Sequence, residues 1–391
     1  MNSKETYDFL SISKTEKVIL SCAGLYPSSP RNSIFCRIRQ IITLSVIVLV
    51  VVPITVFGIQ NISNTMKSTQ AFFISLSIVA SIVKIINFII NLDKLVLFKK
   101  YLSSDIFHDK AWINIKRMKR DMEDISKVSK FYGLMITTGL IALFMEPFFD
   151  KSDENSYFRL PFESWIPWDI SDFRNYMLTY LAQTSFATTA AVTTAAIDSL
   201  FATMCSIVCT EIRVLKYNLG NLDYFAPDLL VRNELRRNII LYEEILNASE
   251  AIEKLFSYGV LGQFFSSIIV ICFTLFHLIS PSMDEESDPL ARYSYLTSCL
   301  AYLMCMLAEV SIYCIYGQGV LTESSDINQA TYLSNWYVSN IHAKKDLIML
   351  RERAKRPIIL TAGGLFPLTL ETLVKIFKTS YSFLAVLRQR N

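Results

Sequence analysis

Charged residues are scarce in this chain. Lys, Arg, Asp and Glu make up 19% of its 391 residues, whereas hydrophobic residues make up 52%. Soluble proteins carry about 25% charged residues on average, so the deficit argues against a soluble globular protein and favours one embedded in a membrane. The net charge of +3 adds little, because it averages a basic set of segments with an acidic one.

Metal-binding and disulfide patterns are also missing. The three histidines, His108, His277 and His342, are scattered, and none belongs to a zinc-like spacing. Of the eight cysteines, none falls in a predicted outer loop, which argues against an extracellular disulfide framework. Cys205 and Cys209 have no nearby histidine, so we interpret them as small packing residues. We therefore expect no metal, no cofactor, no catalytic residues and no enzymatic activity.

Seven apolar segments are long enough to cross about 30 Å of hydrocarbon. They cover residues 35–59, 70–92, 131–149, 173–210, 255–280, 293–316 and 365–387. Residues 1–33 lack an apolar core followed by a small-residue cleavage site, so no signal peptide is expected. The fold class predicted is an all-α membrane protein with seven transmembrane helices.

The distribution of basic residues predicts the orientation. Lys and Arg concentrate before the first span and in residues 94–130, 213–254 and 344–356, while the alternate loops hold few. Basic loops stay in the cytoplasm, so the N-terminus is expected inside and the C-terminus outside. The Asn-Ile-Ser sequon at Asn61 then lies outside and is a predicted glycosylation site, whereas the sequon at Asn247 lies inside and is expected to stay bare.

Helices 4–7 are predicted to extend below the membrane into a cytoplasmic anchor bundle. The fourth continues to about Leu219, a turn follows, and Asp228 caps a second long helix whose apolar stripe needs a partner. After the sixth, apolar residues recur at helical spacing at Trp336, Asn340, Ala343, Leu347 and Leu350. The alternative is surface helices lying on lipid head groups. Expected divisions are a cytoplasmic segment (1–34), spans 1–6 (35–312), an anchor segment (313–364) and a last helix with a short outer tail (365–391).

Few charges lie within the spans, and each needs an explanation because charge is costly in hydrocarbon. Lys84 and Glu309 lie toward the inner ends of their spans, where snorkelling would suffice, and Asp198 is expected to have a packing or capping role. The last span carries Glu371 and Lys375, four residues apart. A helix this polar suits the lining of a water-filled pore. The alternative is that Glu371 and Lys375 form a buried ion pair.

Small and aromatic residues mark the outer halves of the spans. The fourth span holds a run of Ala, Ser and Thr between Thr184 and Ala196, which suits close helix packing. The outer ends of spans two to six are rich in aromatic residues. An interfacial aromatic belt and an apolar ligand pocket explain these residues about equally well.

The last part of the chain carries four ordered motifs: Tyr313-Cys-Ile-Tyr-Gly317 with Ser324, Ser325, Ala330, Tyr332 and Trp336-Tyr337; Pro357-Ile-Ile-Leu-Thr-Ala-Gly363; Phe366-Pro-Leu-Thr-Leu-Glu-Thr372; and Lys378-Thr-Ser-Tyr-Ser-Phe383. In these motifs the chain resembles the insect odorant receptors, and the resemblance is specific over residues 313–388. The short turn between the fourth and fifth spans resembles an odorant-tuning subunit, since the shared co-receptor carries an inserted loop there.

That resemblance implies a heterotetrameric, ligand-gated, non-selective cation channel in the plasma membrane of olfactory neurons. The expected partners are the co-receptor subunit, the lipid bilayer, permeating monovalent and divalent cations, and a small volatile apolar ligand, with no nucleic acid. The last helix would line the pore, with Tyr381, Leu384, Leu387 and Arg388 at the pore and gate. The ligand pocket would lie in the outer half of spans two to six, and we predict it at Phe72, Phe73, Met145, Phe148, Tyr180, Gln183, Thr184, Phe273, Phe276 and Tyr302.

Two other functions share parts of this pattern. A gustatory-type receptor channel would have the same architecture and a different stimulus, but the Gln-Phe pair expected after Ser380-Tyr381 is absent. A G-protein-coupled receptor would have its N-terminus outside, against the charge pattern, and its Asp-Arg-Tyr and Asn-Pro-x-x-Tyr motifs are not found in the expected spans.

Overall fold

The computed structural model describes residues 14–26, 34–102, 112–149, 159–279 and 289–390 as an almost wholly helical chain. Its helices are α1 (Lys14–Cys22), α2 (Ile34–Gln60), α3 (Thr65–Ile90), α4 (Leu92–Leu102), α6 (Trp112–Phe149), α7 (Phe173–Gly220), α8 (Asp228–Ile279), α9 (Pro289–Ser325), α10 (Ile327–Tyr332), the 3-10 turn η1 (Trp336–Val338), α11 (Ile341–Ala354) and α12 (Leu370–Arg390). Two short strands, β1 (Thr361–Ala362) and β2 (Phe366–Pro367), pair antiparallel just before α12.

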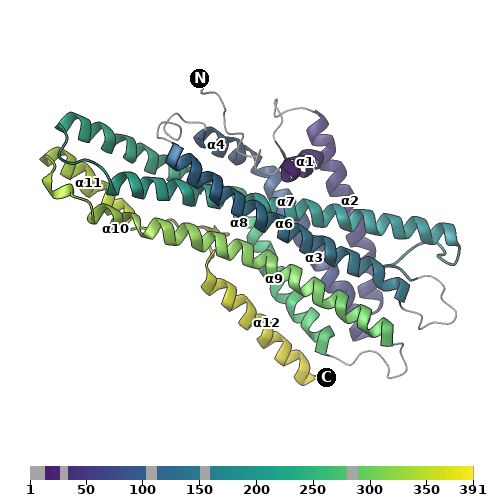
Figure 1. The fold of residues 1–391 in the computed structure, drawn as a ribbon. Helices are drawn as coiled ribbons and strands as arrows, with labels where there is room; N and C mark the ends of the chain where they lie inside the picture. The colour runs from purple at the N-terminus through teal and green to yellow at the C-terminus, as the bar shows by residue number, and fades with distance from the viewer. Residues whose placement is uncertain (1–13, 27–33, 103–111, 150–158, 280–288, 391) are drawn as a thin grey trace.

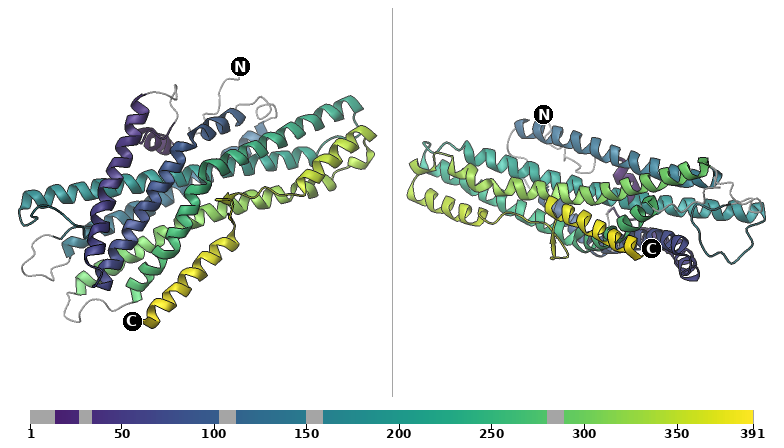
Figure 2. Two further views of the ribbon diagram at one scale, coloured as in Figure 1. Left: turned by 180° about the vertical axis from the view of Figure 1, so that it is seen from behind. Right: turned by 90° about the horizontal axis from the view of Figure 1, so that it is seen from below.

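The long helices α6, α7, α8 and α9 run lengthwise through the molecule (Figure 1). The helices α10 and α11 lie at one end, and α2 and α3 lie toward the other (Figures 1 and 2). Against the side of this bundle, α12 contacts α8 and α9. Six helices among the described residues, namely α2, α3, α6, α7, α8 and α9, are long and apolar enough to cross a membrane. At 21 residues α12 also has the length of a span, but its Lys and Glu side chains make it more polar.

The predicted extensions of the fourth and fifth segments are confirmed. α7 has 48 residues and α8 has 52, about twice what a membrane requires. The side chain of Asp223 accepts a hydrogen bond from the Phe225 amide at 3.1 Å and stabilises the turn between them. On α8, Leu235 and Ile252 of the predicted apolar stripe are buried against the other helices of the chain. The extension therefore finds its partners within this chain.

At the same end, the structure differs from the prediction in the segment after α9. Ala343, Leu347 and Leu350 form the buried face of α11, as expected. Trp336 instead lies in the 3-10 turn, and Asn340 precedes α11 and caps it by accepting a hydrogen bond from the Ile341 amide at 2.5 Å. Asparagine at a helix N-terminus favours a cap over a helical position, and this preference outweighs the apparent periodicity.

The break before the last helix contains a hairpin that the sequence did not predict. Gly363 and Gly364 both have positive φ, of 61° and 71°, which suits the tight turn between β1 and β2. The Gly363 amide donates to the backbone oxygen of Ser257 at 3.1 Å and to its Oγ at 2.7 Å, so the turn is attached to α8. The hairpin occupies residues through Pro367, and α12 starts at Leu370, five residues later than the start at 365 that we expected.

Gly317 on α9 allows the segment before α12 to approach closely. A Cβ at this position would come within 2.5 Å of the backbone oxygen of Leu368. We expect Gly317→Ala to lower the stability of the protein by about 1–3 kcal/mol through overpacking. Thermal unfolding of the purified protein in detergent would measure this.

Gly133→Ala is the matched control, because a Cβ at this helical position meets nothing within 4 Å. It should leave stability unchanged or raise it slightly, since alanine favours a helix over glycine. Equal melting temperatures for the two variants would contradict the close approach at Gly317.

Candidate functional site

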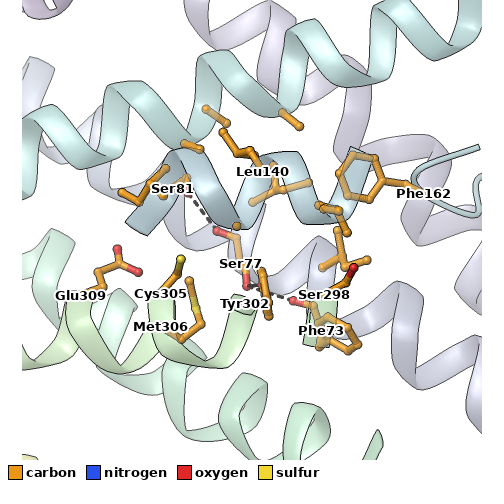
Figure 3. Close-up of a pocket in the computed structure, with 18 of the residues that line it drawn as sticks. Phe73, Ser77, Ser81, Leu140, Phe162, Ser298, Tyr302, Cys305, Met306 and Glu309 are labelled. Carbon is orange, nitrogen blue, oxygen red and sulfur yellow. Dashed lines mark hydrogen bonds between the residues drawn. The ribbon is translucent and has the colours of Figure 1, made fainter. Parts of the chain in front are cut away.

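A cavity of about 170 Å³ lies among α3, α6, α7, α8 and α9 (Figure 3). Its walls are mainly apolar, with Phe73, Ile74 and Ile78 from α3, Ile136, Leu140 and Leu143 from α6, and Met306 from α9. Phe162, from the segment between α6 and α7, lies at one end, and Glu309 lies at the other (Figure 3). Enclosed, mainly apolar cavities with a few polar groups are typical binding sites for small molecules.

Each wall is one face of a helix. On α7, the lining residues are Ala187, Ala190, Ala191 and Thr194, spaced three or four residues apart. These belong to the run of small residues that we attributed to close helix packing. Here their small side chains leave space, so this face of the run forms a wall of the cavity. The spacing follows from the 3.6-residue period of the helix.

Phe162, at the outer end of the cavity, belongs to residues 159–171, which we call the outer segment. Phe162 is 3% exposed, and the side chain of Gln183 binds both of its backbone groups, through Oε1 at 3.3 Å and Nε2 at 3.2 Å. Gln183 Nε2 also donates to Ser164 Oγ at 2.8 Å. The backbone amide of Trp165 donates to the Pro53 oxygen of α2 at 3.0 Å. Gln183, which we predicted as a ligand contact, therefore holds the outer segment in this structure.

The inner end of the cavity is a buried cluster of charges. Lys84 Nζ lies 2.8 Å from Asp198 Oδ1 and 2.5 Å from Glu309 Oε1. Tyr132 and Tyr313 donate hydrogen bonds to Asp198, at 3.0 Å and 2.5 Å. The snorkelling explanation for Lys84 and Glu309 is wrong, because Lys84 is 2% and Glu309 6% exposed and the two bind each other. The expected packing role of Asp198 is in fact ion pairing, which joins α3, α7 and α9.

The ten residues predicted for the pocket do not all lie in the cavity wall. Phe73 and Tyr302 lie in the cavity wall, with ring centroids 5.4 Å apart. Tyr180 donates to the Phe144 oxygen at 2.8 Å and stacks edge-to-face on Phe148, nearer the protein surface. The others lie outside the wall among the described residues: Phe72, Thr184 and Phe273 are half-buried, Met145 is 45% exposed, Phe276 is buried, and Gln183 binds the outer segment. Their part in ligand binding stays a prediction.

Several wall residues escaped the sequence reasoning. Ser77 and Ser81 on α3 and Ser298 and Cys299 on α9 line the cavity together with the two aromatics. The sequence signal was present as polar residues on one face of each span, at 70, 77 and 81 and at 295, 298, 302 and 309. The pocket was instead predicted from the aromatic residues at the outer ends of the spans.

A hydrogen-bonded chain runs from the cavity wall toward α12. Tyr295 lines the cavity, and its hydroxyl lies 2.6 Å from His277 Nδ1. His277 Nε2 lies 2.9 Å from Thr69 Oγ1, and Thr69 donates its own proton to the Met66 oxygen at 3.1 Å. A neutral imidazole protonated at Nε2 satisfies every group in this chain.

The helix α12 shows one covered and one open face. Leu384 is 6% exposed and packs with Phe276 and Cys272 of α8, with Met66 packed against this cluster. Tyr381 is 69% exposed. The side chains of Leu387 and Arg388 lie outside the described residues. Their roles and those of Tyr381 and Leu384 at the pore stay predictions.

The charges of α12 lie on its open face. Lys375 Nζ lies 2.7 Å from Glu371 Oε1, so the ion pair forms, but both side chains are more than two-thirds exposed, and the pair is not buried. An exposed pair of this kind contributes little to stability. The open face of α12 therefore remains available for a pore or a neighbouring subunit.

Asn61 lies in the turn that follows α2, where its Nδ2 donates to the Phe57 oxygen at 2.9 Å. We expect Asn61→Gln to abolish a glycosidase-sensitive shift in mobility, and Asn247→Gln, the control, to leave it in place. Loss of the shift in the Asn247 variant alone would contradict the orientation predicted from charge. Immunoblots of the protein expressed in insect cells, with and without glycosidase, measure this.

Comparison with known proteins gives a consistent match. Residues 64–381 match the family described as 7tm Odorant receptor. The chain is 25% identical to Putative odorant receptor 85d of Drosophila melanogaster over 59% of this chain and 54% of that protein, so the match spans only about half of that relative. It is 23% identical to Odorant receptor 23a of the same species over 89% of both chains. The structure of the insect olfactory receptor OR5 from Machilis hrabei in complex with eugenol superposes with a TM-score of 0.83, covering 98% of this chain and all of that one at 15% identity.

Proposed function

This chain belongs to the odorant receptor family, whose members are multi-pass membrane proteins and not enzymes, and from that premise we propose that it is the odorant-binding subunit of a ligand-gated cation channel. The gustatory and G-protein-coupled alternatives are set aside by this membership. In the proposed complex the chain assembles with an odorant co-receptor subunit in the plasma membrane of an olfactory neuron. A small volatile ligand is its stimulus, and monovalent and divalent cations pass through the pore.

The observation that carries this proposal is the mainly apolar cavity lined by five helices and by Phe162 of the outer segment. Burial of a ligand there favours apolar volatile molecules by about 25 cal/mol for each Å² of apolar surface removed from water. Phe73 and Tyr302 from our predicted set contribute aromatic walls. The relative whose structure contains eugenol has a fold of the same kind.

The route from this cavity to the pore is also part of the proposal. Tyr295 would sense the ligand and transmit its position to His277 on α8. The residue before His277 is Phe276, which packs against Leu384 of α12. Displacement of the outer end of α8 would therefore shift the outer half of α12, which we propose lines the pore with Tyr381, Leu384, Leu387 and Arg388.

Whole-cell recording tests this function. Cells expressing this chain with an odorant co-receptor should show ligand-evoked, non-selective cation current within a panel of volatile alcohols, esters, aldehydes and aromatics. Current that requires the co-receptor would identify a tuning subunit, and current from the chain alone would identify a homomeric channel. Silence in both, with receptor confirmed at the cell surface, would contradict the proposal.

A further inference from the structure

The hydroxyl groups that line the cavity already donate their protons to other groups of the protein. A hydroxyl group carries one proton and two lone pairs, so its partner decides whether it offers a donor or an acceptor to a ligand. Ser77 Oγ donates to the Phe73 oxygen at 3.0 Å, Ser81 Oγ to the Ser77 oxygen at 3.0 Å, and Thr194 Oγ1 to the Ala190 oxygen at 2.9 Å. Each of these hydroxyls therefore presents only lone pairs to the cavity.

The remaining hydroxyls of the wall follow the same rule. Ser298 Oγ donates to the Ala142 oxygen at 3.1 Å, and Tyr132 donates to Asp198 at 3.0 Å. Tyr295 donates to His277 in the arrangement that satisfies that chain. Because the Ser77 proton is already used, the hydrogen bond between Ser77 and Tyr302 takes its proton from Tyr302. The protons of these hydroxyl groups are therefore used in hydrogen bonds within the protein and are not offered to a ligand.

Glu309 adds a carboxyl group that accepts hydrogen bonds at the inner end. It accepts from Lys84 Nζ through Oε1 at 2.5 Å and from Gln263 Nε2 through Oε2 at 2.9 Å. A carboxylate has about four lone-pair positions, so two remain for another donor. With both carboxyl groups ionised, the single charge of Lys84 faces two negative charges from Asp198 and Glu309, and the cluster carries one excess negative charge.

Donors are few in the wall. Among the lining residues in the described part of the chain there is no Lys, Arg or His. The Gln263 amide already donates to Ser267 and Glu309, and the Cys305 thiol donates to the Met135 oxygen. The amide of Gln70 is at the outer end of the α3 face. A second carboxyl group, Glu146, also lines the cavity from α6. A buried acceptor without a donor partner costs free energy, and a carboxylate ligand would add a negative charge to a site that has no cation in its wall.

We propose that the ligand of this cavity carries a hydrogen-bond-donating head, a hydroxyl or an amine, which binds Glu309, and that the cavity excludes carboxylic acids. The ligand's apolar body fills the space between Phe162 and Glu309 (Figure 3). Glu309 then determines specificity for the class of ligand. This inference rests on the proposed function, because it assumes that odorants bind in this cavity.

A ligand series with one skeleton and different heads tests the inference. Benzyl alcohol, benzylamine, benzyl methyl ether and benzoic acid would be applied to cells that express the chain with a co-receptor, and the series repeated on a hexyl skeleton. We expect the alcohol or the amine to activate at concentrations at least about tenfold below the ether, which accepts but cannot donate, with the acid inactive. Comparing the activating concentrations of the alcohol and the amine shows whether the preferred donor is neutral or positively charged.

Glu309→Gln separates recognition from folding, because the amide oxygen can still accept from Lys84. The variant should lose the preference for donor heads, so that the alcohol, the amine and the ether activate at similar concentrations. Surface labelling of the variant shows separately whether it folds. Glu146→Gln is the matched control and should retain the preference. Loss of the preference in the Glu146 variant instead would overturn the assignment to Glu309.

The two proposals fail differently. An ether or ester that activates as well as the alcohol and the amine on both skeletons, or better, would overturn the donor inference and leave the odorant receptor function intact. A current evoked by benzoic acid at the same concentration as benzyl alcohol would do the same. Silence toward every ligand of the wider panel, with both subunits at the surface, would contradict the proposed function itself.

Discussion

Lys84→Met is expected to prevent most of the receptor from reaching the cell surface. The substitution would leave Asp198 and Glu309 buried together with no cation, since Lys84 Nζ lies within 2.8 Å of one and 2.5 Å of the other. Removing one partner of a buried ion pair costs roughly 3–5 kcal/mol, which is a large fraction of the roughly 5–15 kcal/mol by which proteins are stable. Surface labelling of intact cells, normalised to total receptor, measures the loss.

Two controls distinguish the ion pair from a general effect of removing a lysine. Lys67→Met changes an exposed lysine of the same helix and should reach the surface normally. Adding Asp198→Asn and Glu309→Gln to Lys84→Met removes the charges as a set and should recover part of the surface expression, because buried charges are costly mainly when unpaired. Normal surface expression of Lys84→Met alone would show that the cluster does not stabilise the fold.

This cluster shows where sequence reasoning stopped. The positions of Lys84 and Glu309 within their spans were readable, and each by itself fits a side chain that reaches the membrane surface. Whether two charges from helices more than 200 residues apart meet depends on the rotation and depth of each helix. Those quantities depend on the packing of all the helices together, which the hydropathy of single spans does not determine.

The positions of the helices were easier to predict from the sequence. The length of the hydrophobic segments predicted the spans, and the polar residues near Asn221 and Asp228 predicted the turn between α7 and α8. The hairpin before α12 was not predicted, because two pairs of residues form too short a strand to leave an alternating pattern. Local chemistry therefore predicted where helices end better than what connects them.

The cavity was only partly predictable for a similar reason. Tyr302 and Phe73 were identified from aromatic content, but aromatic residues that line a cavity and those that face lipid look alike in sequence. Gln183 was predicted as a ligand contact, and in the structure its side chain binds the backbone of Phe162. Loops carry no hydropathy signal that would place such a partner.

Ala191→Phe is expected to abolish the response to odorants at concentrations that saturate the unmodified receptor. Ala191 lies in the middle of the α7 wall, and the new ring would occupy space that the ligand needs. An aromatic ligand buries roughly 150 Å², worth about 4 kcal/mol. Losing about 3 kcal/mol of this corresponds to a rise of about a hundredfold in the half-maximal concentration. Dose–response recording with the co-receptor measures the shift.

Ser185→Phe provides the matched control, because it adds the same ring to an exposed position on the same helix. It should leave the dose response unchanged. Surface labelling of both variants keeps a folding defect separate from a binding defect, since overpacking at a site that is already full would lower expression. An unchanged response of Ala191→Phe at normal expression would place the ligand outside this cavity.

A graded series makes the test independent of folding. Ala191→Val adds less volume than Ala191→Phe, so it should weaken the response to long ligands while shorter ligands of the same chemical class still fit. A misfolded receptor would instead lose its response to all ligands together. The length of ligand at which each variant loses its response would then measure the distance available between Phe162 and Glu309, the two ends of the cavity.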